Sequence, residues 1–189
     1  MKVRDSGMPE ENYWNSFFDV RRILQELELN ALITDAAEIG TGYGTFTLAA
    51  ASQIQGTLYG FDIEPEMIEH IRKKTSLAHI HNVIPECRDV LSETTGLPDA
   101  SVDYVMLFNI LHNENPETFL EESYRILNKG GKTGIIHWRS DIPTPRGPDL
   151  SIRPKPEEIL TRIDPRKFNI VKSPFNLEPY HFGILLSKR

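Results

Sequence analysis

One acid and three closely spaced glycines stand in the run E-I-G-T-G-Y-G, which begins at Glu38 and contains Gly40, Gly42 and Gly44. Glycine lets the backbone approach a ligand closely, because it has no Cβ. A carboxylate beside such a turn repels a diphosphate and attracts a ligand that carries a cationic amino group. The run therefore predicts a binding turn for a positively charged small molecule.

A second acid, Asp62, follows the first glycine by 62 − 40 = 22 residues. That spacing places an acid on a ribose diol in nucleoside-binding α/β folds. The nicotinamide pattern G-x-G-x-x-G needs a glycine at position 45, where this chain has Thr45 and brings its third glycine one residue earlier. The pattern favours a cationic nucleoside over a dinucleotide, and an NAD-dependent oxidoreductase remains the alternative.

The elements expected to position these residues alternate between strand and helix. Apolar runs predict seven strands, at 36–40, 57–62, 82–87, 101–109, 132–138, 168–173 and 182–187. Helical periodicity and caps predict a first helix that runs to about Leu29, a helix at 45–53, one opened by Pro65, one from Pro116 capped by Asn115 and ended by Gly130 and Gly131, and a short one at 157–163.

This alternation predicts an α/β fold: a Rossmann-like, doubly wound, mostly parallel seven-stranded sheet in three α/β/α layers. Only about eight residues separate the two final strands, too few for a crossover helix. We therefore expect a hairpin there, with the last strand antiparallel to the others. The chain is expected to form a single domain at residues 1–189, with an N-terminal helical segment at 1–30 beside the site and a proline-rich loop at 139–156.

Four features occur in a fixed order: the E-x-G-x-G-x-G turn, Asp62, the pair Arg88-Asp89, and the run K-G-G-K that begins at Lys129. In these features the chain resembles the class I S-adenosylmethionine-dependent methyltransferases. It is most similar to the small-molecule branch that includes the ubiquinone/menaquinone biosynthesis C-methyltransferases, over residues 36–138. The resemblance implies S-adenosyl-L-methionine as cofactor, S-adenosyl-L-homocysteine as product, and methylation of carbon, oxygen or a heteroatom on a small-molecule acceptor.

The resemblance also implies which residues bind this cofactor. They are Glu38, Gly40, Gly42 and Gly44 for the methionine end, Asp62 for the ribose, Ile63, Met67, Asp89 and Val90 for the adenine, and Asn109 between the methionine and the acceptor. Each has a plain structural alternative. The acids can cap helices or turns or face solvent, and Met67 can be a core residue.

Two histidines stand near expected strand ends on the acceptor side. His112 follows Asn109 by about one helical turn, and His137 ends the fifth strand. A neutral imidazole accepts a proton from a hydroxyl or a carbon acid, so both are candidate bases, with a structural role as the alternative.

The acceptor pocket has further candidate residues outside the cofactor motif. Loop 139–156 contains five prolines, and its arginines are candidates for binding an acidic acceptor, with solvated surface charge as the alternative. The candidates are Tyr13, with Trp14 beside it, Trp138, Arg139, Arg146 and Arg153.

The bulk composition excludes several other classes. The net charge of −6 gives no general attraction to nucleic acid or anionic membrane, and no Asn/Asp-Pro-Pro-aromatic turn typical of base methylation follows the fourth strand. Cys87 is the only cysteine, and the pair His79 and His81 lacks a third ligand, so no metal site is expected. We expect a cytoplasmic monomer or homodimer, with a cofactor-binding protein that transfers no methyl group as the functional alternative.

Overall fold

Seven strands form one sheet in the part of the chain that the computed structural model describes, residues 8–189. The strand order is β3-β2-β1-β4-β5-β7-β6, and all neighbours pair in parallel except β7, which is antiparallel to both β5 and β6. The strands are β1 (Ala36–Ile39), β2 (Leu58–Asp62), β3 (Val83–Cys87), β4 (Val102–Phe108), β5 (Leu127–Trp138), β6 (Phe168–Leu177) and β7 (His181–Lys188). The predicted fold and the antiparallel last strand are confirmed.

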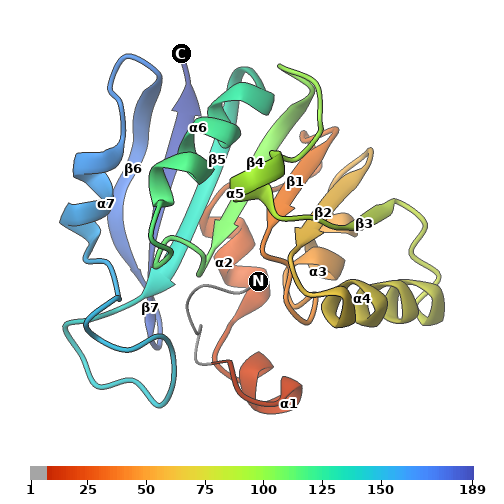
Figure 1. Cartoon of the computed structure of the whole chain (residues 1–189), viewed down its shortest axis with the longest axis horizontal. Coiled ribbons are helices and arrows are strands. Elements are labelled where there is room, and N and C mark those ends of the chain that lie inside the picture. Colours follow the sequence, from red (N-terminus) through yellow and green to blue (C-terminus); the bar gives the residue numbers. More distant parts are fainter. Residues whose placement is uncertain (1–7) are drawn as a thin grey trace.

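Helices cover both faces of this sheet (Figure 1). They are α1 (Glu11–Asn15), α2 (Val20–Glu26), α3 (Thr47–Ala51), α4 (Pro65–Leu77), α5 (Val90–Glu93), α6 (Pro116–Ile126) and α7 (Pro156–Arg162). One buried cluster joins α2 and α3 to Ala36, Tyr104 and Met106, and a second joins α6 and α7 to Ala37 and Val105. Successive strand residues thus point to opposite faces, each of which packs a helix layer.

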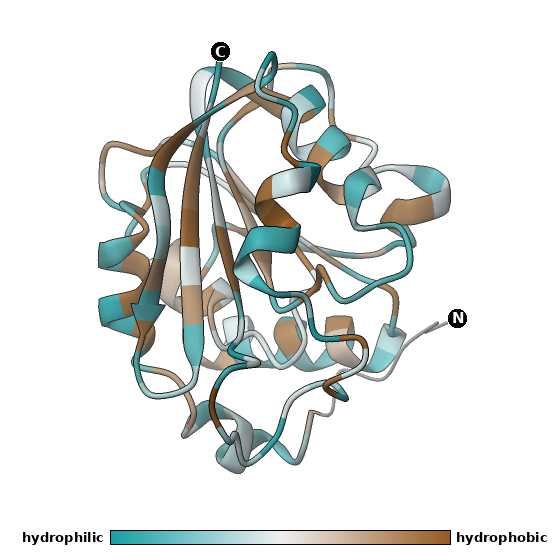
Figure 2. Cartoon of the chain, turned by 90° about the vertical axis from the view of Figure 1, so that its left-hand side faces the viewer, coloured by the Kyte–Doolittle hydropathy of each residue, from teal (hydrophilic) through white to brown (hydrophobic). Residues whose placement is uncertain are grey.

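The hydropathy of the chain follows these layers (Figure 2). Apolar segments concentrate on the strands in the middle of the molecule, and polar ones on the outer turns of the flanking helices. Within residues 8–189, no helix combines the length and the apolar content needed to cross a bilayer.

The predicted first helix was wrong as a single element, because the segment forms two short helices, α1 and α2. Phe17 and Phe18 lie between them and are both buried, at 3% and 9% exposure. Asp19 begins the second helix as its N-cap, because its side chain accepts a main-chain N–H of that helix's first turn at 3.1 Å. The break lets Phe17 pack on Trp138 at 5.4 Å and Phe18 on Phe46 at 5.2 Å between ring centroids.

The predicted end of the helix after β4 was also wrong. Helix α6 ends at Ile126, and β5 begins at the next residue, so Gly130 and Gly131 lie inside the strand. The pairing of β4 with β5 shifts register there, and Gly130 has φ +78°. A Cβ on Gly131 would lie 3.0 Å from the Asp103 carbonyl oxygen. The glycines therefore allow the irregular first part of β5 to lie close against β4.

The sheet reverses its strand order between β1 and β4. From β1 the chain proceeds through β2 to β3 on one side, and then returns to place β4 on the other side of β1. Ligands of open α/β sheets bind beyond the carboxyl ends of the strands at this point. Helix α1 and loop 139–156 lie at the same edge of the sheet, the lower edge in Figure 1.

Candidate functional site

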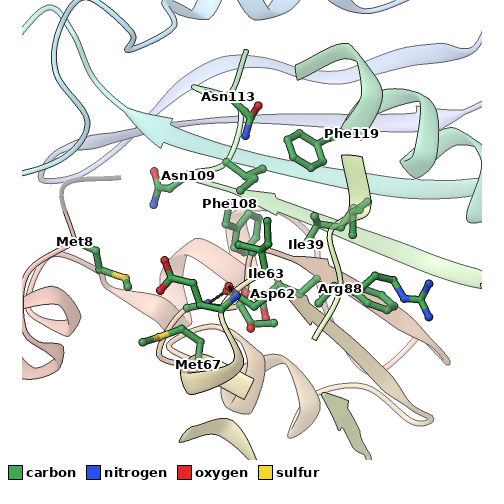
Figure 3. A pocket seen from close by; sticks show the side chains of 18 of the residues that line it. Met8, Ile39, Asp62, Ile63, Met67, Arg88, Phe108, Asn109, Asn113 and Phe119 are labelled. Atoms are coloured by element: carbon green, nitrogen blue, oxygen red, sulfur yellow. Dashed lines mark hydrogen bonds between the residues drawn. The ribbon is translucent and has the colours of Figure 1, made fainter. Parts of the chain in front are cut away.

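A pocket opens at the carboxyl ends of β1, β2 and β4, where the strand order reverses (Figure 3). Of the ten predicted cofactor residues, all but Gly44 line it: Glu38, Gly40, Gly42, Asp62, Ile63, Met67, Asp89, Val90 and Asn109. Its remaining wall includes residues that sequence reasoning did not select, among them Met8, Phe46, Arg88, Phe108, Ile110, Asn113 and Phe119. The fold therefore collects motifs from four separate loops into one cavity.

The glycine turn connects β1 to α3 and packs its backbone against its neighbours. Gly40 has φ +84°, and its N–H donates to the Phe61 carbonyl at 2.7 Å. A Cβ at Gly40 would lie 3.0 Å from Ile110 Cδ1. Gly44 lies behind the pocket, where a Cβ would lie 2.9 Å from Leu48 Cδ1. Gly44 therefore permits helix packing, and Gly40 permits backbone at the cavity wall.

Glu38 is buried in this pocket, at 2% exposure, so it is not a surface acid. The Thr47 hydroxyl donates to its Oε2 at 2.5 Å. Burial raises the pKa of Glu38 to about 8, and the nearby Asp62 carboxylate adds to the rise. Two acids in one buried cavity favour a cationic ligand, because a positive charge offsets their mutual repulsion.

Asp62 ends β2 and has two roles at once. Its Oδ2 accepts from the Gly42 N–H at 2.8 Å and its Oδ1 from the Glu64 N–H at 3.0 Å. The carboxylate thus fixes the glycine turn as well as lining the pocket. Burial raises its pKa, against the opposing effect of these N–H donors. Each oxygen has a second lone pair that a hydroxyl can use.

Asp89 also lines the pocket and caps a helix. It precedes α5, and its Oδ1 accepts from the Leu91 N–H at 3.1 Å. Ile63 and Met67 come from the end of β2 and the first turns of α4, and both face the same cavity (Figure 3). Asp62 and Asp89 thus each accept main-chain N–H groups and line the pocket at the same time.

Asn109 and His112 come from the loop that follows β4. Asn109 has φ +55° and is 8% exposed, and its Oδ1 is buried without a hydrogen-bond partner in the described chain. A buried acceptor left open in a pocket calls for a ligand donor. His112 is buried and lines the same pocket.

His137 lies behind His112 and does not line the pocket. It is fully buried, and the two imidazole rings are 5.6 Å apart between centroids. Burial, with the neighbouring His112, holds the pKa of His137 well below its usual range. Of the two candidate bases, the structure therefore places only His112 against the ligand space.

The aromatic candidates divide in the same way. Trp14 lines the pocket, while the adjacent Tyr13 is 41% exposed and does not. Trp138 is fully buried in an aromatic cluster, 6.1 Å from the Trp14 ring and 5.4 Å from that of Phe17. Trp14 thus forms part of the pocket wall, and Trp138 packs behind Trp14 without lining the pocket.

None of the three candidate arginines of loop 139–156 lines the pocket. Arg139 pairs with Asp141 at 2.8 Å, and the Arg146 side chain is exposed. Arg153 is 7% exposed and donates to the Pro148 carbonyl at 2.7 Å, the Arg139 carbonyl at 2.8 Å and Thr144 Oγ1 at 2.8 Å. Its guanidinium holds the loop together.

In residues 8–189, no group of three or more His, Cys, Asp and Glu side chains is arranged to hold a metal ion.

Comparisons with known proteins point to one class. A family model described as a methyltransferase domain matches residues 36–131. An uncharacterized methyltransferase-like protein of Schizosaccharomyces pombe is 32% identical over 99 residues, 52% of this chain and 36% of that protein. The aklanonic acid methyltransferase DauC of a Streptomyces species is 29% identical over 144 residues, 70% of this chain and 64% of DauC. The chain thus spans between one third and two thirds of these relatives.

The fold also matches solved structures. The crystal structure of a SAM-dependent methyltransferase from Aquifex aeolicus superposes with a TM-score of 0.83 at 21% identity, over 95% of this chain and 94% of that one. At this identity the match concerns the fold, and it extends through the C-terminal hairpin beyond the residues that the family model covers.

Proposed function

The chain belongs to the class I S-adenosylmethionine-dependent methyltransferases, and from that premise we propose that it methylates a small organic acceptor bound next to the cofactor in the pocket at the ends of β1, β2 and β4. The observation that carries this proposal is the meeting of Glu38, Asp62 and Asp89 with the glycine turn in one cavity. The nicotinamide alternative falls with the family assignment, because this family uses S-adenosylmethionine.

The pocket residues fit this cofactor. Glu38, Gly40 and Gly42 would hold the methionine end, and the open Oδ1 of Asn109 would accept from its ammonium. Asp62 would bind the ribose hydroxyls. Ile63, Met67, Asp89 and Val90 would enclose the adenine. The acceptor groups match the ligand, because the acids are buried where a cation would lie and the Asn109 amide oxygen lacks a donor within the described chain.

The bound cofactor supplies an electrophilic sulfonium methyl group, which an acceptor atom takes by in-line displacement. The chain must therefore align the acceptor and exclude water, and alignment alone contributes up to roughly 7–11 kcal/mol for well-oriented reactants. His112 is the proposed base: its imidazole lines the pocket and would take the proton that the acceptor atom gives up when it is methylated. His137 acts behind His112 as a neutral packing partner.

Two observations support a small organic acceptor. Trp14, Phe46, Phe108 and Phe119 give the pocket apolar ring surfaces, which suit a carbon skeleton. DauC is named for aklanonic acid, an organic acid. The methylated atom is proposed to be carbon, oxygen or a heteroatom of this acceptor.

Calorimetry tests cofactor binding, and label transfer tests the acceptor. Wild-type protein should bind S-adenosylhomocysteine and not NAD. With methyl-tritiated cofactor and a cell extract, label should appear in the fraction of low molecular mass, and His112→Asn should slow the transfer without changing the affinity for S-adenosylhomocysteine. Label in protein or nucleic acid would overturn the small-molecule proposal, and binding without any transfer would favour a cofactor-binding protein.

A further inference from the structure

A group of polar contacts connects helix α1 to the glycine turn, and three of its four residues lie outside the methyltransferase motifs. We call Glu11, Tyr43, His70 and Lys74 the α1 junction. Lys74 on α4 donates from Nζ to Glu11 Oε1 at 2.6 Å and to the Tyr43 carbonyl at 3.0 Å. His70 Nε2 lies 2.9 Å from the other Glu11 oxygen. One ammonium group therefore joins α1, α4 and the glycine turn.

Two further hydrogen bonds attach the same segment to the turn. The Tyr43 hydroxyl donates to the Pro9 carbonyl at 3.1 Å, and Thr45 Oγ1 donates to Asn15 Oδ1 at 2.7 Å. These contacts hold residues 9 and 15, the two ends of the α1 segment. Tyr43 lies between two of the turn glycines. The polar contacts of α1 are thus directed at the element that binds the cofactor.

The segment held in this way forms one wall of the pocket. Met8 precedes α1 and Trp14 lies within it, and both line the cavity. A Cβ on Gly42 would lie 3.4 Å from Met8 Sδ, so the wall reaches the glycine turn itself. In Figure 3, Met8 and Met67 lie on the same side of the pocket. A ligand seated on the turn would therefore contact the α1 segment.

Helix α1 is held in place by these polar contacts together with the packing of the buried Trp14. It has five residues, too few for stability on its own. The Glu11–Lys74 pair is only 27% and 28% exposed, and contact with Lys74 lowers the pKa of Glu11. A partly buried pair that also donates to the main chain contributes more than an exposed surface ion pair.

We propose that Lys74 and Glu11 are positioning residues that set how long the cofactor and its product stay bound. Release of a ligand held between the turn and the Met8–Trp14 wall requires the wall to move, and the α1 junction resists that movement. Lys74 acts on both sides, because it holds the wall through Glu11 and the turn through Tyr43. This inference rests on the proposed placement of the cofactor in this pocket.

Dissociation of the bound cofactor tests the inference. The protein is loaded with tritiated S-adenosylmethionine and chased with excess unlabelled cofactor. Lys74→Met should raise the dissociation rate about tenfold, the size of one lost charge-assisted hydrogen bond, and Glu11→Gln should raise it less. Because both act through one junction, the double variant should match Lys74→Met alone. Lys74→Arg keeps the positive charge and should release the cofactor almost as slowly as the wild type.

Two control variants separate the junction from general effects on α4. Lys73→Met and Glu66→Gln change exposed side chains of the same helix and should leave the dissociation rate as in the wild type. Wild-type dissociation from Lys74→Met and Glu11→Gln, or equal acceleration in the controls, would overturn the inference. If Lys74→Met does not fold, Glu11→Gln and Lys74→Arg decide it. Failure of the wild type to bind the cofactor would instead refute the proposed site.

Discussion

The charged groups of the pocket and those of loop 139–156 lie at the same edge of the sheet, but they differ in how much of their hydrogen-bonding capacity the fold itself uses. In the pocket, Glu38 is buried with a raised pKa, and Asp62 keeps lone pairs free for a ligand. In the loop, Arg153 gives its donors to the loop's own carbonyls and Arg139 pairs with Asp141. A charged residue can act as a binding group only where the fold leaves it unsatisfied.

Removing the buried arginine should have the largest effect. Arg153→Met leaves several carbonyls of the loop without their donor, and we expect the free energy of unfolding to fall by about 3 kcal/mol. The affinity for S-adenosylhomocysteine should stay within about twofold, because Arg153 does not line the pocket. Urea unfolding and calorimetry measure the two quantities. If Arg153→Met left the free energy of unfolding unchanged and abolished binding of S-adenosylhomocysteine, Arg153 would belong to the binding site and not to the support of the loop.

Asp62→Ala should have the next largest effect, mainly on binding. It removes the proposed ribose acceptor and the acceptor of the Gly42 N–H that fixes the glycine turn, so the affinity for S-adenosylhomocysteine should weaken by about 2 kcal/mol. Asp62→Asn, which keeps one carbonyl oxygen, should lose less. Calorimetry on the three proteins decides the matter, and equal affinities would place the ribose elsewhere.

The raised pKa of Glu38 predicts a pH dependence with a definite sign. The empty protein holds the proton up to about pH 8, whereas the unfolded chain loses it near the ordinary value of 4.5. The contribution of Glu38 to stability therefore falls as the pH rises between these values, and is constant above them. The ammonium group of S-adenosylhomocysteine favours the ionised form of Glu38, so the affinity for this ligand should rise about tenfold from pH 6 to 7.

Glu38→Gln is the control for this pH effect. It should flatten the pH dependence of both quantities, stabilise the empty protein at pH 8, and weaken ligand binding. Thermal melts and calorimetry at pH 6, 7, 8 and 9 measure them. A pH dependence that survives in Glu38→Gln would assign it to another group, such as Asp62, whose pKa burial also raises.

The smallest effect is expected at Arg146, an exposed residue of loop 139–156. Arg146→Ala should change the free energy of unfolding by no more than about 0.5 kcal/mol, because the side chain is exposed. It should leave the affinity for S-adenosylhomocysteine unchanged. Once an acceptor is known, its KM measured with Arg146→Ala shows whether this arginine contacts it. A destabilisation comparable to that of Arg153→Met would show that the loop depends on both residues.

The chemistry of the cofactor side was largely predictable from the sequence. Glycines at two-residue spacing after an acid, and Asp62 at a fixed distance beyond them, depend on local geometry at strand ends. The parallel sheet and its final hairpin follow from apolar periodicity and connection length. These predictions hold because each depends on residues that are close together in the chain. Parallel strands then bring their carboxyl ends to one edge of the sheet.

Only the tertiary structure decided which of the remaining candidates face a ligand. The first helix is divided in two, with Phe17 and Phe18 buried between the parts, and Gly130 lies inside the first part of β5. Arg153 finds its acceptors inside its own loop, and Lys74 meets Glu11 from 63 residues away. Such outcomes depend on which donors and acceptors remain unpaired after the core has packed, a property of the whole fold that no local spacing contains.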